Sequence, residues 1–189
     1  MCGIVGLFLK DRALEPQLGA MLTDMLITMT DRGPDSAGIA IYSGEAKGRA
    51  KLTIQSDVPD RDFENLTSEL QQEIQGDIKI TINSTHAVLE IQESQVSAAR
   101  MALRVLRPEV RIMSFGASLE IYKEVGLPKD VAARFSVKQM AGSHGIGHTR
   151  MATESAVTTM GAHPFNTGDD QCLVHNGSLS NHNSLRRKL

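Results

Sequence analysis

The chain opens with an almost wholly apolar run, CGIVGLFL at residues 2–9, which limits its possible folds more than any other feature. A strand of this kind, apolar on both faces, is typical of a sheet that is covered on both sides. The run also places Cys2 directly behind the initiator methionine, although a cysteine that only fills a core can occupy any buried position. We therefore expect a layered fold and treat Cys2 as a candidate reactive residue.

A helix and a second strand are predicted next. Apolar side chains recur at every third or fourth position over residues 18–29, as they do on the buried face of a helix. Gly33 and Pro34 end this helix, and a strand is predicted over Ala37–Tyr42. The residues of the apolar stripe are Leu18, Met21, Leu22, Met25, Leu26 and Met29.

Composition places the chain among ordinary globular proteins. Its 189 residues suit a single domain, with 41% hydrophobic and 22% charged residues and a formal charge of −2, which does not favour binding to nucleic acid or to an anionic membrane. The two cysteines, Cys2 and Cys172, have neither a disulfide framework nor metal-ligand spacing, so we expect no metal site. We expect a cytoplasmic protein, because neither a leader nor a spanning helix is apparent.

The middle of the chain, residues 44–139, is more polar than its flanks and has its own pattern of strands and helices. We therefore predict an inserted α+β subdomain there. Two alternating runs, residues 77–83 and 86–92, are separated by Ser84 and Thr85 and so predict a hairpin. A helix is predicted over residues 94–106 before Pro108, and the run VRIMSFG predicts a further strand.

Residues after Gly142 are rich in Gly, His, Asn, Ser and Thr, which are typical of loops and hydrogen-bonding sites. The segment SNHNSLRRKL at the end predicts the start of a capped helix.

The residue types near the two ends suit attack on a carboxamide. Loss of Met1 would give Cys2 an α-amine with a pKa of about 7.7–8.0, which can accept the proton of the adjacent thiol. Asn176 and Gly177 offer a side-chain amide and an accessible backbone N–H for an oxyanion. Arg150 can pair with a carboxylate through its planar guanidinium, and the hydroxyl of Thr153 can add a hydrogen bond. L-Glutamine has one amide to cleave and one carboxylate to anchor.

Five motifs, in order, resemble the class II glutamine amidotransferase domain of the N-terminal-nucleophile hydrolases. They are MCGIVGLF, RGPDSAGIAIY, GHTRMAT, AHPF and LVHNGSLSNH. The resemblance covers roughly the first 45 and the last 50 residues. It implies a four-layer αββα sandwich that hydrolyses glutamine to glutamate and ammonia through a γ-glutamyl thioester.

The same resemblance implies a role for each matching residue. Cys2 would be the nucleophile, Asn176 and Gly177 the oxyanion hole, and Arg150 and Thr153 the groups that hold the substrate carboxylate. Arg32, Gly33 and His163 would line or support the pocket.

The sequence departs from this family in three ways. The insertion at 44–139 lengthens the usual spacing between the RG and HTR motifs, and Glu154 stands where several members have histidine. No later acidic motif for the substrate amine is present, so we expect the front part of a longer domain with a truncated C-terminus. The insertion, together with the motifs RGPDSAGIAIY and HNGSLSNHNSLRRKL, most resembles the separate glutaminase subunit of glutamate-synthase-like enzymes, including N-methylglutamate synthase. That likeness implies a hetero-oligomer, in which a partner subunit carries FMN and an iron–sulfur cluster and receives the ammonia.

Other interpretations remain open at this stage. Cys2 can be a buried strand cysteine, and Cys172 suits a core position. The histidines at 144, 148, 163, 175 and 182 lack metal-ligand spacing, which favours roles in hydrogen bonding. The chain can also be a non-catalytic glutamine-binding or regulatory subunit, or an N-terminal-nucleophile hydrolase that cleaves another amide.

Overall fold

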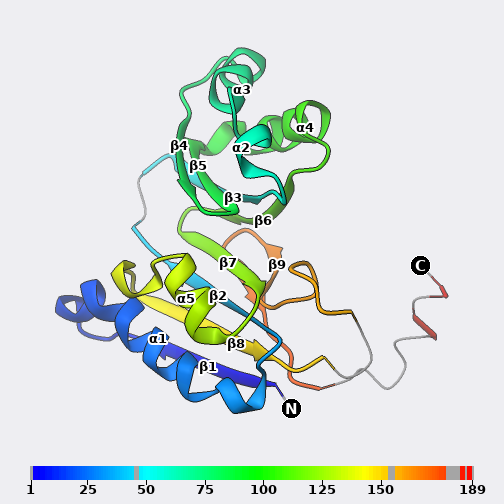
Figure 1. Ribbon diagram of the computed structural model, residues 1–189. Coiled ribbons are helices and arrows are strands. Elements are labelled where there is room, and N and C mark those ends of the chain that lie inside the picture. Colours follow the sequence, from blue (N-terminus) through cyan, green and yellow to red (C-terminus); the bar gives the residue numbers. More distant parts are fainter. Residues whose placement is uncertain (1, 45–46, 153–155, 178–183, 186, 189) are drawn as a thin grey trace.

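The computed structural model describes residues 2–44, 47–152, 156–177, 184–185 and 187–188 (Figure 1). Its first sheet has four strands in the order β1-β8-β2-β7, and each neighbouring pair is antiparallel. The strands are β1 (Gly3–Phe8), β2 (Ser36–Tyr42), β7 (Leu119–Val125) and β8 (His144–Arg150). The sheet thus joins both ends of the sequence, with β1 at one edge and β8 beside it.

Helices cover one face of this sheet (Figure 1). Leu18, Leu22 and Leu26 of α1 are fully buried against Ile39 and Ile41 of β2, so the predicted stripe is confirmed. Burial of each such side chain stabilises the fold by about 1.5–3 kcal/mol. The elements on this face are η1 (Arg12–Gln17), α1 (Leu18–Thr28), η2 (Thr30–Arg32), α5 (Pro128–Arg134) and η4 (Val137–Gln139).

The opposite face of the sheet carries a short hairpin of β9 (Phe165–Gly168) and β10 (Gln171–Leu173). Ala40 and Tyr42, which alternate with the helix-facing residues of β2, point to this side. Cys172 is half-buried here, and its Sγ lies 3.5 Å from the hydroxyl oxygen of Tyr42. Cys172 therefore contributes to packing, as its apolar surroundings in the sequence predict.

A second four-stranded sheet, in the order β4-β5-β3-β6, lies above the first (Figure 1). The hairpin predicted around Ser84 and Thr85 is confirmed, since β4 and β5 pair from Asn83 with His86 onward. Helices α3 and α4 pack their apolar sides on the core of this sheet. Its elements are β3 (Arg49–Gln55), α2 (Pro59–Asp62), α3 (Leu66–Ile74), β4 (Lys79–Asn83), β5 (His86–Gln92), η3 (Glu93–Gln95), α4 (Val96–Leu106) and β6 (Arg111–Gly116).

Within the range 44–139 that the sequence marks as an insertion, only residues 49–116 build the second sheet and its helices. Strand β7 belongs to the first sheet, because it pairs with β2 and its Leu119 and Ile121 pack against Ala40. Helix α5 belongs there too, because its buried side chains lie in the core on the helix-covered face. All strand pairs within the three sheets are antiparallel, and the α+β class predicted from the sequence is confirmed.

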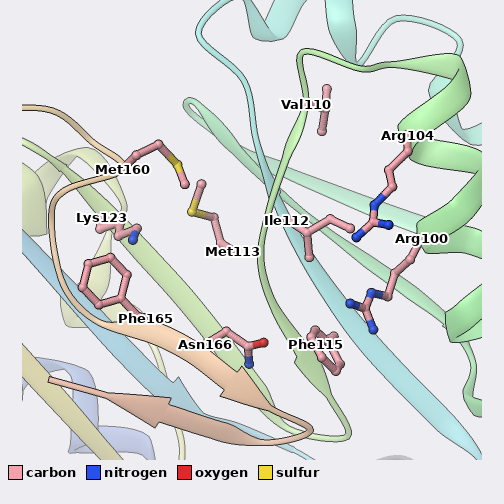
Figure 2. A pocket seen from close by; sticks show the side chains of 10 residues that line it. All are labelled: Arg100, Arg104, Val110, Ile112, Met113, Phe115, Lys123, Met160, Phe165 and Asn166. Atoms are coloured by element: carbon pink, nitrogen blue, oxygen red, sulfur yellow. The ribbon is translucent and has the colours of Figure 1, made fainter. Parts of the chain in front are cut away.

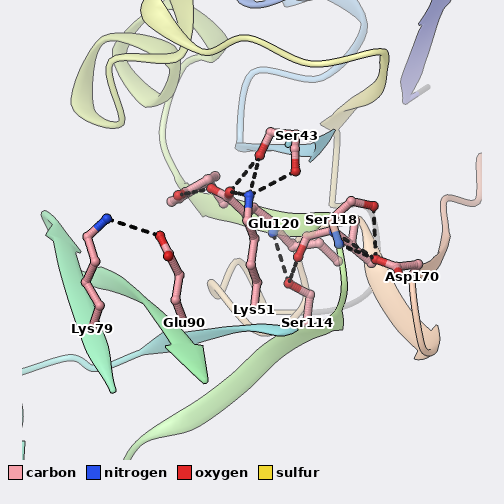
Figure 3. Close-up of polar contacts among 11 residues, drawn as sticks. Ser43, Lys51, Lys79, Glu90, Ser114, Ser118, Glu120 and Asp170 are labelled. Atoms are coloured by element: carbon pink, nitrogen blue, oxygen red, sulfur yellow. Dashed lines mark hydrogen bonds and ion pairs between the residues drawn. The ribbon is translucent and has the colours of Figure 1, made fainter. Parts of the chain in front are cut away.

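Polar contacts fasten the two sheets together where the chain passes between them (Figure 3). The Nζ of Lys51 in β3 lies 2.6 Å from Oε1 of Glu120 in β7, and it also donates to Oγ of Ser43 at 2.7 Å. The carboxylate of Asp170, in the turn of the β9–β10 hairpin, accepts backbone N–H bonds of 2.8 Å from Ala117, Ser118 and Leu119. The turn between β6 and β7 is thereby fixed to the hairpin.

Strand β1 departs from the expectation that both of its faces are covered. Val5 is buried on the helix side, but Ile4 and Phe8 on the other side are 41% and 67% exposed. The cause is the position of β1 at an edge of the sheet, beyond the reach of the β9–β10 hairpin. In the described part of the chain no helix has the length and apolar character needed to cross a bilayer.

Candidate active site

Cys2 lies at the start of β1, where the backbone is held from the helix side. The backbone N–H of Gly3 donates to Oγ1 of Thr149 at 3.2 Å, and that hydroxyl donates to the carbonyl of Met29 at 3.1 Å. A side chain at Gly3 would meet both neighbours, since its Cβ would lie 2.8 Å from Met29 Cβ and from Thr149 Oγ1. The thiol of Cys2 is half-buried and lies 3.9 Å from the carbonyl oxygen of Met151.

Two of the predicted site residues contact the main chain of Cys2. The side-chain Nδ2 of Asn176 donates to the Cys2 carbonyl at 2.9 Å, and Nε of Arg32 donates to the same oxygen at 3.4 Å. The predicted oxyanion donor and the predicted pocket arginine therefore meet at the candidate nucleophile, although they come from distant parts of the sequence. Gly177 follows Asn176 with a φ of 140°, a conformation that suits glycine.

Gly33 follows Arg32 and makes a close backbone approach. A Cβ on Gly33 would lie 2.4 Å from the carbonyl carbon of Thr149 and 2.5 Å from the backbone nitrogen of Arg150. The backbone beyond it bridges to the same strand, because Pro34 pairs with Arg150 and Asp35 N donates to the Arg150 carbonyl at 3.1 Å. Glycine is therefore required for the turn to lie against the end of β8.

Arg150 ends β8 on the same face of the sheet as Cys2. Gly3 pairs with Thr149, so Cys2 and Arg150 lie one position further along the same two antiparallel strands. Arg150 is only 8% exposed, and its Nη1 donates to the carbonyl of Ala156 at 3.3 Å. A largely buried guanidinium on the face of the sheet that carries Cys2 suits a small anionic group.

His163 lies behind this site rather than next to the thiol. Its ring stacks on His148, with centroids 4.3 Å apart, and Nε2 of His148 donates to the carbonyl of His175 at 3.0 Å. The chain segment that leads into Asn176 is thus held by His148, which is held in turn by His163. Burial is the main cause that lowers the pKa of both rings, that of His163 to about 4, so both are neutral at physiological pH.

Lys123 is a supporting residue that sequence reasoning missed, whereas the hydrogen bond of His148 agrees with the role expected of the histidines in this segment. The Nζ of Lys123 donates to the carbonyls of Ala162 at 2.8 Å and Pro164 at 3.2 Å, on either side of His163. Burial lowers the pKa of Lys123 to about 8. A lysine at an inward-facing position of the alternating strand LEIYKEV is the one signal that could have drawn attention to it.

Two predictions lie outside what the structure describes. Thr153, predicted to help hold a carboxylate, and the helix start predicted in SNHNSLRRKL fall wholly or mostly on residues that are not described. Among the described residues, no three histidine, cysteine, aspartate or glutamate side chains form a group that could hold a metal ion.

Sequence comparison relates the whole chain to named proteins. The chain is 66% identical over 189 residues to the glutamine amidotransferase-like protein GlxB of Rhizobium meliloti, a match that covers 100% of this chain and 62% of that protein. A Methanothermobacter thermautotrophicus protein with glutamine amidotransferase in its name is 33% identical over 199 residues, covering 100% of this chain and 65% of that protein. The isomerizing glutamine–fructose-6-phosphate aminotransferase of Pseudomonas putida is 35% identical over 78 residues, which are 41% of this chain and 13% of that protein. These relatives support assignment of the chain to the class II glutamine amidotransferases.

The resemblance carried by the five sequence motifs is therefore confirmed. The chain spans 62% and 65% of the length of the first two relatives. No protein-family profile matches the chain. The candidate site brings together the segments around Cys2 and around Asn176, which lie far apart in the sequence.

Proposed function

We propose that this chain is a glutaminase domain that hydrolyses L-glutamine to glutamate and ammonia with Cys2 as the nucleophile. The observation that carries the proposal is the contact of the Asn176 side chain with the main chain of Cys2, at 2.9 Å. This contact brings a side-chain amide donor to the residue that carries the thiol, which supports a role for Asn176 as an oxyanion donor.

The proposed reaction begins after Met1 is removed. The α-amine of Cys2 accepts the thiol proton, and the thiolate attacks the carboxamide carbon of glutamine. The resulting oxyanion accepts hydrogen bonds from Asn176 Nδ2 and from the Gly177 N–H. Collapse of the tetrahedral intermediate breaks the C–N bond, the amine returns its proton to the leaving ammonia, and a thioester remains. Water activated by the same amine then releases glutamate and frees the thiol.

The substrate carboxylate would be held by Arg150, with Thr153 as a second donor. Support comes from the burial of Arg150 and its place beside Cys2 on one face of the sheet. Arg32 and Gly33 would shape the wall of the pocket, and His163 would support the segment before Asn176.

The predicted four-layer αββα sandwich is part of the proposal. Helices α1 and α5, the first sheet and the β9–β10 hairpin are consistent with three successive layers, the hairpin being the beginning of the second sheet. The exposed side chains of Ile4 and Phe8 lie on the face that such a second sheet would cover.

We further propose that the ammonia passes to a synthase partner of the glutamate synthase or N-methylglutamate synthase kind. That partner would carry FMN and an iron–sulfur cluster, because the two cysteines of this chain cannot ligate a cluster.

Two measurements test the glutaminase. Intact-mass analysis should show that Met1 is absent, and glutamate release from glutamine should be lost in Cys2→Ala, with Cys172→Ala as the matched control. Retention of Met1, or equal activity in Cys2→Ala, contradicts the proposal and favours a regulatory subunit. Hydrolysis of other amides in preference to glutamine would point to a different N-terminal-nucleophile hydrolase.

A further inference from the structure

A pocket of about 390 Å³ lies between the two sheets, away from Cys2 and its neighbours. One wall of the pocket is formed by helix α4 and strand β6. The other wall is formed by strand β7, the segment that leads into β9 and the start of β9 (Figure 2). A volume of this size suits a small molecule, since ligand pockets are typically about 300–1,000 Å³.

Three cationic side chains line this pocket, and no acidic residue is among the described residues that do so. Arg100 and Arg104 extend from α4 toward β6, while Lys123 comes from β7 (Figure 2). None of the three forms an ion pair with any carboxylate in the described ranges of the chain. Charges gathered without a counter-ion favour an anion from outside the chain.

Arg100 is positioned by an aromatic ring, while its buried Nε–H donor stays without an acceptor among the described residues. Its guanidinium carbon lies 4.0 Å from the centroid of the Phe115 ring, and its buried Nε has no hydrogen-bond partner within the described structure. A buried donor without a partner is costly, and an acceptor on a bound ligand would remove that cost. The ring also orients the guanidinium plane, which prepares it for a planar anionic group.

Apart from Asn166, the remaining side chains that line the pocket are apolar. Met113 and Phe115 of β6 face Phe165 and Met160 across it (Figure 2). The Nζ of Lys123 lies 4.5 Å from the centroid of the Phe165 ring and donates to two backbone carbonyls, which leaves one of its three N–H groups available among the described residues. Apolar walls together with cationic side chains suit a ligand that has both an apolar body and an anionic group.

We infer that this pocket is a binding site for a small organic anion, with its anionic group held by Arg100 and Arg104 and its apolar body between Phe115 and Phe165. The site is separate from the glutaminase chemistry proposed at Cys2, and its occupancy does not depend on that activity.

Three simple probes separate the parts of this inference. Benzoate has both an anionic group and an apolar body, benzyl alcohol has only the body, and inorganic phosphate has only the charge. Each is titrated into the whole protein carrying ¹³C-methyl methionine, at low ionic strength because salt screens such contacts. The chain has 9 methionines, and single Met→Leu variants assign their signals.

The titrations should give saturable shifts of the Met113 and Met160 signals with benzoate, at concentrations about tenfold below those needed for phosphate or benzyl alcohol. Met29 and Met151 lie beside Cys2 and report on that site instead. Shifts confined to Met29 and Met151 would show that benzoate occupies the Arg150 site, and would overturn the inference, as would the absence of saturable benzoate binding.

Variants provide the second arm of the test. The double variant Arg100→Gln and Arg104→Gln should bind benzoate at least about tenfold more weakly, whereas Arg12→Gln, an exposed arginine on η1, should bind it as the unmodified protein does. Unchanged affinity in the double variant overturns the inference. Should that variant unfold, Arg100→Lys and Arg104→Lys keep the charge but lose the planar group, and equal benzoate affinity in them also overturns it.

Discussion

The side-chain amide of Asn176 donates a 2.9 Å hydrogen bond to the carbonyl oxygen of Cys2, across a separation of 174 residues in the sequence. Arg32 reaches the same oxygen at 3.4 Å. The start of β1 is therefore fixed from the side of the HNG motif and from the turn after α1, so the position of the thiol depends on both segments.

Replacement of Asn176 by alanine should lower kcat for glutamine by about 10²–10³, with a smaller change in KM, because loss of an oxyanion donor acts mainly on the transition state. Steady-state glutamate release measures the effect. Asn83→Ala is the matched control, since the Asn83 amide also donates to a backbone carbonyl, that of Phe135 at 2.9 Å, but far from Cys2. Equal kcat values for the Asn176→Ala variant and the unmodified protein would exclude Asn176 from the oxyanion hole.

Replacement of Arg150 by lysine should raise KM for glutamine by about tenfold or more, because lysine keeps the charge but cannot form the bidentate pair. Hydrolysis of a simple amide without a carboxylate, such as propionamide, should change little in the same variant. The ratio of the two kcat/KM values is the informative quantity. A parallel loss for both amides would mean that Arg150 supports the fold of the site instead of the substrate carboxylate.

Because Lys123 is buried, we expect the free energy of unfolding to depend on pH. Its pKa falls from 10.5 to about 8 in the folded protein because of burial, so the unfolded chain binds more protons between these values. Its contribution to the free energy of unfolding should therefore rise with pH across this window, by up to about 3 kcal/mol. Urea unfolding at pH 7.5 to 10.5 should show this rise in the unmodified protein relative to Lys123→Met. Parallel pH profiles for the two proteins would count against a buried, charged Lys123.

A side chain at position 33 should lower both the stability of the fold and the glutaminase activity, because the space there is filled by the backbone of β8. A Cβ there would lie 2.4 Å from the backbone of Thr149, so Gly33→Ala should destabilise the fold by about 1–3 kcal/mol and displace the end of β8 that carries Arg150. Gly6→Ala is the control, because its nearest neighbour would be 4.0 Å away. Thermal unfolding and the glutamine KM measure the two effects. A Gly33→Ala variant as stable as Gly6→Ala would show that the turn can adjust.

Local patterns in the sequence predicted those elements whose periodicity reflects their own packing. The stripe from Leu18 to Met29 and the alternation on either side of Ser84 and Thr85 are of this kind. The residues of the HNG, HTR and RG motifs were also identified in advance, and the structure brings Asn176 and Arg32 to Cys2.

Features that depend on tertiary placement could not be read in the same way. Strand β7 has the alternation of any half-buried strand, and nothing local shows that it pairs with β2 rather than with β6. The roles of Lys123 and His148 depend on carbonyls of residues 162, 164 and 175, which the fold alone brings to them. Exposure of Phe8 follows from the edge position of β1, which an apolar run does not reveal.

The pairing of Tyr42 with Leu119 in the first sheet means that the second sheet is connected at a single place. The chain leaves that sheet after Tyr42 and re-enters it at Leu119, so the two connections to the second sheet start from adjacent positions. A short turn between those positions would join β2 to β7 as an ordinary hairpin and leave the strand order β1-β8-β2-β7 unchanged. We therefore expect that the second sheet can be removed or replaced at this point without disturbing the strands next to Cys2 and Arg150.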